Sequence, residues 1–159
     1  MSEILNIPED GLVIISGGQV GVDQAGLEVA IKLDLPHGGW CPKGRIQIGG
    51  IIPRKYKLQE HSSSKYPPRT KANVESSDGT MVFYLGKKGR GTKLTIKHLL
   101  DCQKPLFEID LERPTEVDEV IQWAKENEIR VFNIAGTRNL EAAEPTQEFL
   151  TKFFQGLLA

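Results

Sequence analysis

The sequence has few of the residues that form disulfide, zinc or membrane-spanning structure. Only two of its 159 residues are cysteines, Cys41 and Cys102, and their spacing matches neither a disulfide framework nor a zinc motif. No run of about 18 apolar residues occurs, which argues against a membrane-spanning helix. The first residues lack the basic and then apolar layout of a secretory signal. We therefore expect a cytoplasmic protein with no membrane partner and no metal site.

Basic and acidic residues are unevenly distributed along the chain, although the net charge is only −1. Residues 1–40 contain one Lys or Arg and six Asp or Glu, residues 41–100 contain thirteen and three, and residues 101–159 contain six and twelve. A basic stretch between two acidic ones is either a solvated face or an electropositive cleft that attracts an anion. Its position relative to the glycine-rich motifs decides between these two readings.

Apolar runs alternate with helical patterns along the chain, which is typical of βαβ units. Short β-branched runs predict strands at 12–15, 81–85, 105–109 and 130–135, with a weaker one at 35–40. Helices are predicted from an N-cap at Asp23 to about Leu33, over 91–101, from an N-cap at Thr115 to about Asn127, and from Pro145 onward. Such strands, joined by helices, favour a parallel sheet covered on both faces. The prediction is one α/β domain over residues 1–159, doubly wound and Rossmann-like.

Residues 41–79 do not follow this alternation. Compact domains rarely keep a structureless loop beyond about 15 residues unless it serves a site or is disordered. A short helix over about 69–76 is predicted to shorten the loop. Because the segment is rich in Lys and Arg, we expect a basic flap over the ligand-binding edge of the sheet. Its candidate ligand-binding residues are Lys43, Arg45, Arg69, Thr70 and Asn73.

The first glycine loop reads Ser-Gly-Gly-Gln-Val-Gly-Val-Asp and lies between a predicted strand and a predicted helix. Glycines let the backbone approach a ligand closely, and the N-terminus of the following helix attracts an anion. The loop is similar to the dinucleotide fingerprint, but no acidic residue follows the next strand, so NAD is not expected. The alternative reading is a tight strand-to-helix turn. The candidate ligand-binding residues here are Ser16, Gly17, Gly18, Gln19, Gly21 and Asp23.

Two further loops follow strands in the same way. The second spans residues 86–92 and is not a P-loop, because Thr92 stands where that motif needs lysine. The third contains Arg138, which can hold a phosphate or carboxylate through two parallel hydrogen bonds. A flexible basic loop and a surface arginine are the alternative readings. No nucleophile–base–acid set is visible, so binding is predicted rather than catalysis, and the further candidates for phosphate binding are Gly89, Gly91, Thr92, Gly136 and Arg138.

These motifs, in this order, resemble the family named putative molybdenum carrier proteins. The resemblance runs from about residue 12 to the C-terminus, and its most specific piece is the string Gly-Gly-Trp-Cys-Pro-Lys-Gly-Arg at 38–45. The family is similar to a wider Rossmann-like group that includes lysine-decarboxylase-like phosphoribohydrolases and DNA-processing proteins. The resemblance implies a carrier that holds molybdenum cofactor, or another phosphorylated, nucleotide-like ligand, across the glycine loops.

Two other functions stay open within the same resemblance. Phosphoribohydrolases have a glutamate three residues after the Gly-Thr pair of the second loop, where this sequence has Thr95, so N-glycosidic hydrolysis is less expected. The similarity of the first two loops to DNA-processing proteins leaves single-stranded nucleic acid as a ligand, with Tyr56 and Tyr66 as candidates for base stacking. A homo-oligomer is also compatible with the sequence.

Overall fold

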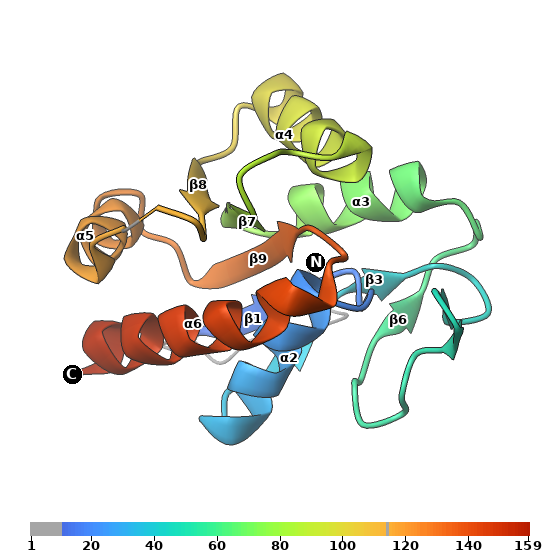
Figure 1. Ribbon diagram of the computed structural model, residues 1–159, viewed down its shortest axis with the longest axis horizontal. Coiled ribbons are helices and arrows are strands. Elements are labelled where there is room, and N and C mark those ends of the chain that lie inside the picture. Colours follow the sequence, from blue (N-terminus) through green and yellow to red (C-terminus); the bar gives the residue numbers. More distant parts are fainter. Residues whose placement is uncertain (1–10, 114) are drawn as a thin grey trace.

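The computed structural model describes residues 11–113 and 115–159, and a five-stranded parallel sheet lies at its centre (Figure 1). The order of the strands across the sheet is β2–β1–β9–β7–β8, and every neighbouring pair is parallel. The doubly wound, Rossmann-like α/β prediction is therefore confirmed. The strands are β1 (Val13–Ile15), β2 (His37–Gly38), β7 (Gly79–Tyr84), β8 (Leu106–Asp110) and β9 (Val131–Gly136).

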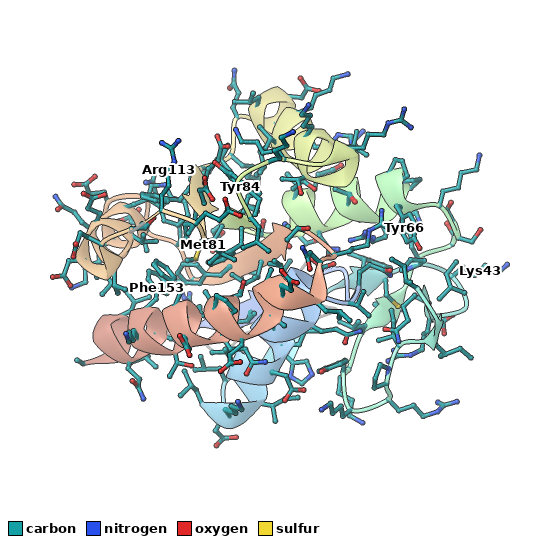
Figure 2. All side chains as sticks on the ribbon, in the orientation of Figure 1. Lys43, Tyr66, Met81, Tyr84, Arg113 and Phe153 are labelled. Atoms are coloured by element: carbon teal, nitrogen blue, oxygen red, sulfur yellow. The ribbon has the colours of Figure 1, made fainter. Side chains whose placement is uncertain are left out.

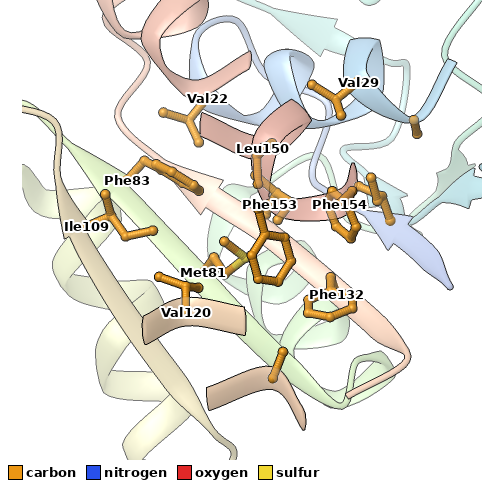
Figure 3. Close-up of a cluster of buried hydrophobic side chains, with 14 of the residues drawn as sticks. Val22, Val29, Met81, Phe83, Ile109, Val120, Phe132, Leu150, Phe153 and Phe154 are labelled. Carbon is orange, nitrogen blue, oxygen red and sulfur yellow. The ribbon is translucent and has the colours of Figure 1, made fainter. Parts of the chain in front are cut away.

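Helices cover both faces of this sheet. One face is packed by α2 (Val22–Lys32), α5 (Val117–Glu126) and α6 (Ala143–Leu158), and the other by α3 (Tyr66–Ser76) and α4 (Arg90–Cys102). The first interface forms the larger core, with Phe132 of β9 edge-on to Phe153 and Phe154 of α6 at ring-centroid distances of 5.6 and 5.2 Å (Figure 3). Buried β-branched and aromatic residues of this kind give a central strand its two apolar faces.

Two predicted helix caps are wrong. The N-cap of α2 is Gly21, and the Asp23 side chain lies in the first turn, where it makes no capping bond. The reason is tertiary: the Val22 amide donates to the Thr137 carbonyl at 3.1 Å, so the loop after β9 takes over part of the capping. Helix α5 likewise begins after Glu116 rather than at Thr115.

The segment between β2 and α3 contains short strands that the sequence does not predict. The weak strand expected at 35–40 is divided between β2 in the central sheet and β3 (Trp40–Cys41), which pairs with β6 (Gln59–Glu60). A hairpin joins β4 (Ile46–Gln47) to β5 (Gly50–Ile51). Helix α3 begins three residues earlier than predicted, because prolines occupy its first turn, where they are favoured.

The last helix also differs slightly from its prediction. Helix α6 begins at Ala143, after the 3-10 turn η1 (Leu140–Ala142), rather than at Pro145. The side chain of Asn139 caps η1 by accepting the amide of Glu141 at 2.9 Å. Within the described residues, no helix has the length and apolar character needed to cross a membrane.

Candidate functional site

A narrow recess of about 60 Å³ opens at the carboxyl edge of the central sheet, between α3, α4 and the loops after β1 and β9. We call it the central recess. It brings residues of the first, second and third glycine loops to one place, as the sequence predicts for strands whose carboxyl ends meet at one edge. Its walls are formed by Gly17, Gln19, Asp23, Tyr66, Arg69, Thr70, Asn73, Gly91, Leu94, Thr95, Asn133, Ala135, Gly136 and Arg138.

Close packing of two loops shapes one side of the central recess. Gly21 has φ +88°, and a Cβ at this position would lie 2.6 Å from the Thr137 carbonyl oxygen and 2.9 Å from the Arg138 Cα. Only glycine meets both requirements, the left-handed backbone and the missing side chain. The first and third glycine loops are thereby held together, which places Arg138 at the recess.

A buried ion pair lies inside the central recess. Arg69 Nη1 is 3.6 Å from Asp23 Oδ2, and these side chains are only 13% and 8% exposed. Burial raises the pKa of the Asp23 carboxyl, and the nearby Arg69 charge opposes that rise. Burial also lowers the pKa of the Arg69 guanidinium, opposed by Asp23. Arg69 Nε has no hydrogen-bond partner among the described residues, so the guanidinium retains a free donor.

The Arg69 guanidinium lies directly against the backbone of the first glycine loop. A Cβ at Gly17 would be 1.6 Å from Arg69 Nη1 and 3.0 Å from Asp23 Oδ2. The absence of a side chain at Gly17 therefore creates the space that the guanidinium occupies.

Replacing Gly17 with alanine is expected to push Arg69 out of this position. If the recess binds the phosphorylated ligand that the sequence predicts, its affinity should fall by about tenfold, which corresponds to about 1.4 kcal/mol. The displaced atoms are the far end of a flexible side chain, so the free energy of unfolding should fall by less than about 1 kcal/mol. Calorimetric titration and urea denaturation measure the two effects. Ser64→Ala, at an exposed position that does not line the recess, is the control; equal affinity losses in both variants would contradict the role of Arg69.

Two arginines share one aromatic ring at the central recess. The Cζ atoms of Arg69 and Arg138 lie 5.4 and 4.8 Å from the centroid of the Tyr66 ring, near the start of α3 (Figure 2). Such cation–π contacts hold guanidinium groups in place without neutralising them. Of the residues that line the recess, Arg69 and Arg138 are the cations and Asp23 is the only acid. The lining is therefore net positive and suits an anion.

The second glycine loop brings the N-terminus of α4, rather than its own lysines, to the central recess. Gly89 is the N-cap of α4 and no side chain caps this end, so first-turn amides stay available near Gly91 at the recess. Lys88, by contrast, pairs with Glu108 at 2.5 Å. Thr95 is buried in the recess wall and donates from Oγ1 to the Gly91 carbonyl at 3.1 Å.

Two of the predicted polar residues shape the walls of the recess. The Ser16 hydroxyl donates to the Asp23 carbonyl at 3.0 Å and accepts the Gly18 amide at 3.2 Å. Asn73 accepts the Trp40 amide at 2.8 Å and donates to the Trp40 carbonyl at 2.9 Å. Both side chains form hydrogen bonds with backbone atoms, so they position the loops around the recess.

The basic residues before α3 lie outside the central recess. Arg45 Nη2 donates to the carbonyls of Pro53 and Tyr56 at 2.8 and 2.9 Å and thereby closes the loop between them. Lys43 is exposed and projects from the outer edge of the molecule (Figure 2). Of the other predicted residues, Gln19, Thr70 and Gly136 line the recess, whereas Gly18, Gly21, Gly89 and Thr92 lie in its loops without lining it.

Sequence reasoning left several lining residues out of the candidate set. They are Tyr66, Leu94, Thr95, Asn133 and Ala135. The available signals were the place of Tyr66 among the candidates for base stacking and the place of Asn133 in the predicted strand that leads into the third glycine loop. Among the described residues, no three His, Cys, Asp or Glu side chains are grouped as metal ligands.

Comparison with known proteins agrees with the resemblance seen in the motifs. The crystal structure named "Putative molybdenum carrier protein", from Syntrophus aciditrophicus SB, is 40% identical to this chain, with a TM-score of 0.84; the match covers 90% of this chain and 94% of the other. No curated protein sequence matches the chain. Residues 14–155 match the family described as the circularly permutated YpsA SLOG family. The resemblance to molybdenum carrier proteins is thus confirmed, and the chain belongs to the circularly permutated YpsA SLOG family.

Proposed function

We propose that the chain is a binding protein that carries a phosphorylated, nucleotide-like ligand, with the phosphoryl group in the central recess. The observation that carries the proposal is the convergence of Arg69, Arg138 and the N-terminus of α4 on one small recess. Guanidinium groups and helix N-termini are both well suited to hold a phosphoryl group. Molybdenum cofactor, which bears a phosphate, is a candidate cargo, since the similar crystal structure carries a molybdenum carrier name.

The size of the central recess indicates which part of the ligand it receives. Pockets for whole small molecules span about 300–1,000 Å³, whereas this recess measures about 60 Å³. We infer that only the phosphoryl end enters, and that the rest of the ligand lies over the mouth beside the exposed Arg138 and the Tyr66 ring.

The N-glycosidic hydrolase alternative receives little support from the same geometry. Thr95 stands in the recess wall with its hydroxyl bonded to the Gly91 carbonyl, so no carboxylate comes from α4. The acid that does line the recess, Asp23, is paired with Arg69. A carboxylate held in this way is poorly placed to act as a general base.

The two tyrosines predicted to stack with bases are already engaged by other side chains. Tyr56 is 4% exposed, and its hydroxyl donates to Glu28 at 2.5 Å. The Tyr66 ring is in contact with Arg69 and Arg138. Binding of single strands usually depends on aromatic side chains on which bases stack, so a small molecule is favoured.

The proposal predicts that the purified protein retains a phosphorylated compound or takes one up. Mass spectrometry of the denatured extract identifies a retained ligand, and calorimetric titration with AMP and with pterin phosphates measures uptake. An empty protein that binds none of these compounds would contradict the carrier function. Release of ribose 5-phosphate from AMP would instead establish the hydrolase, and an oligonucleotide that binds without competition from AMP would establish the nucleic-acid binder.

A further inference from the structure

A second hollow lies at the carboxyl end of the edge strand β2, on the side of the molecule where β6 is found (Figure 1). We call it the basic hollow; its charged lining residues are Arg45, Arg54, Lys57 and Glu60, and His37 stands in the same wall. It measures about 620 Å³ and shares no lining residue with the central recess. Pockets for whole small molecules span about 300–1,000 Å³, so the basic hollow has the size of a ligand site.

The charge of the basic hollow is positive. Arg45, Arg54 and Lys57 line it, and Glu60 is the only acid among its described lining residues. The Glu60 carboxylate already accepts the Gly44 amide at 2.7 Å. Within the part of the chain that the structure describes, none of the three cations belongs to an ion pair. A concave surface with an excess of one charge concentrates ions of the opposite charge, so the basic hollow attracts anions.

Arg45 is held in a fixed position in the wall of the basic hollow. Its Nη2 donates to the carbonyls of Pro53 and Tyr56 at 2.8 and 2.9 Å, which fixes the plane of the guanidinium. The Nε atom is buried and has no hydrogen-bond partner among the described residues. Buried donors are nearly always satisfied in native structures, so Nε calls for an acceptor that these residues do not supply. Oxyanions are the acceptors that a guanidinium binds most strongly.

The backbone at Gly39 separates the basic hollow from the central recess. Gly39 lines the basic hollow and has φ +122°, and a Cβ there would lie 2.3 Å from the Ser16 carbonyl oxygen and 3.1 Å from Asn73 Oδ1. Asn73 lines the central recess, so the two hollows lie on either side of this backbone. An anion in the basic hollow is therefore held by different groups from an anion in the central recess.

We propose that the basic hollow is a second binding site, separate from the central recess, for a small molecule with two or more oxyanion groups. Arg45 binds one of these groups, and the exposed Arg54 and Lys57 bind another. A single oxyanion fills only a small part of the hollow, whereas linked oxyanions engage several cations at once and gain from their effective concentration. Oligophosphates and polycarboxylates share this chemistry. The inference goes beyond the proposed function and does not depend on it.

His37 provides a local signal for this site in NMR spectra. The chain has three histidines, so their ring signals can be assigned separately. His37 Nε2 accepts the Lys57 amide at 3.1 Å, which holds the ring in the wall of the basic hollow. Burial and the charge of Lys57 lower the pKa of His37, and an anion beside the ring would raise that pKa. His98, on α4, does not line the hollow and is the internal reference.

The experiment titrates tripolyphosphate, citrate and inorganic phosphate into the protein at one fixed ionic strength and near-neutral pH. At least one of the two multivalent probes should shift the His37 signal to saturation and bind at least about tenfold more tightly than inorganic phosphate, the effect of one more charged hydrogen bond. The His98 signal should stay in place. A shift with tripolyphosphate alone would assign the site to oligophosphates, and a shift with citrate alone would assign it to polycarboxylates.

A double variant tests the cations that line the basic hollow. Arg54→Gln with Lys57→Gln should weaken binding of the tighter probe by at least about tenfold. Lys125→Gln with Lys152→Gln is the matched control, because it removes the same two charges from exposed positions on α5 and α6 that do not line the hollow. Arg45 is left unchanged in both variants, since its hydrogen bonds close a loop.

The possible outcomes also separate this inference from the proposed function. A His37 signal that moves with neither multivalent probe would overturn the second site, and equal affinity for inorganic phosphate would overturn its preference for linked oxyanions. Equal losses in the two double variants would indicate general attraction between charges instead of a site. Arg69→Lys alters the central recess alone and should leave the His37 titration unchanged; a loss there would place the anion in the central recess.

Discussion

Replacing Arg69 with alanine is expected to weaken binding of a phosphorylated ligand by about 10- to 100-fold. The guanidinium reaches into the central recess from α3, and a hydrogen bond to a charged group contributes about 1.5–3 kcal/mol. Arg69→Lys should recover only part of the affinity, because an ammonium group cannot form two parallel bonds to one phosphoryl group. Calorimetric titration with AMP measures the change, and Arg113→Ala, at an 85% exposed side chain, is the control. An unaltered affinity in Arg69→Ala would contradict the site.

The same variant should lose stability in a way that depends on pH. Without Arg69, the buried Asp23 carboxylate loses its paired cation and keeps only the weaker influence of Arg138. Breaking a buried pair in this way costs about 3 kcal/mol when the carboxyl is charged. The pKa of Asp23 is already raised by burial, and loss of Arg69 raises it further. The folded state then holds a proton that the unfolded state releases, so stability falls as pH rises from the ordinary carboxyl range through the raised pKa. Urea denaturation at pH 4 and pH 8 should show the larger loss at pH 8.

Replacing Phe132 with alanine is expected to lower the free energy of unfolding by about 3–5 kcal/mol, the usual cost of removing a buried phenylalanine. The ring is fully buried and packs edge-on against Phe153 and Phe154 of α6 (Figure 3). The substitution removes both ring contacts between the central strand β9 and its covering helix. Urea denaturation measures the loss, and a value below about 1 kcal/mol would contradict the packing described.

The Phe132→Ala variant also allows stability and ligand binding to be tested separately. Successive side chains of a strand point to opposite faces, and the next residue, Asn133, lines the central recess whereas Phe132 faces α6. The folded fraction of Phe132→Ala should therefore bind a phosphorylated ligand with unchanged affinity. Leu100→Ala, at a 67% exposed position, is the control for stability and should change it by no more than about 0.5 kcal/mol.

Most of the sheet was predictable from sequence because its strands are short apolar runs that alternate with helical patterns. Runs at 12–15, 81–85, 105–109 and 130–135 became β1, β7, β8 and β9 with shifts of one or two residues at their ends. The small strands at 46–51 and 59–60 were not predictable, because each is only two residues long and largely exposed. Their positions depend on contacts such as those of Arg45 with two distant carbonyls.

The first residue of each helix was predicted less well than the presence of the helix. Asp23 and Thr115 have the side chains that usually cap a helix, but the loop after β9 supplies a carbonyl to α2, and α5 starts after Glu116. Local chemistry allows several starting residues, and a contact between distant segments selects one of them. The same principle applies to Lys88, a basic residue of the second glycine loop, whose charge is paired with Glu108 on β8.

The sequence by itself determined the layers of the fold and the common edge of its glycine loops. Strand period, helix period and glycine position are local properties, and parallel strands must end at one edge. Only the tertiary structure decided which charged groups face the ligand. Asp23 and Arg69 are separated by more than forty residues, and their pairing depends on where α3 packs against the first glycine loop. Because of that packing, Asp23, which the sequence predicts as a helix cap, is instead the buried partner of Arg69, the arginine that we place at the phosphoryl group.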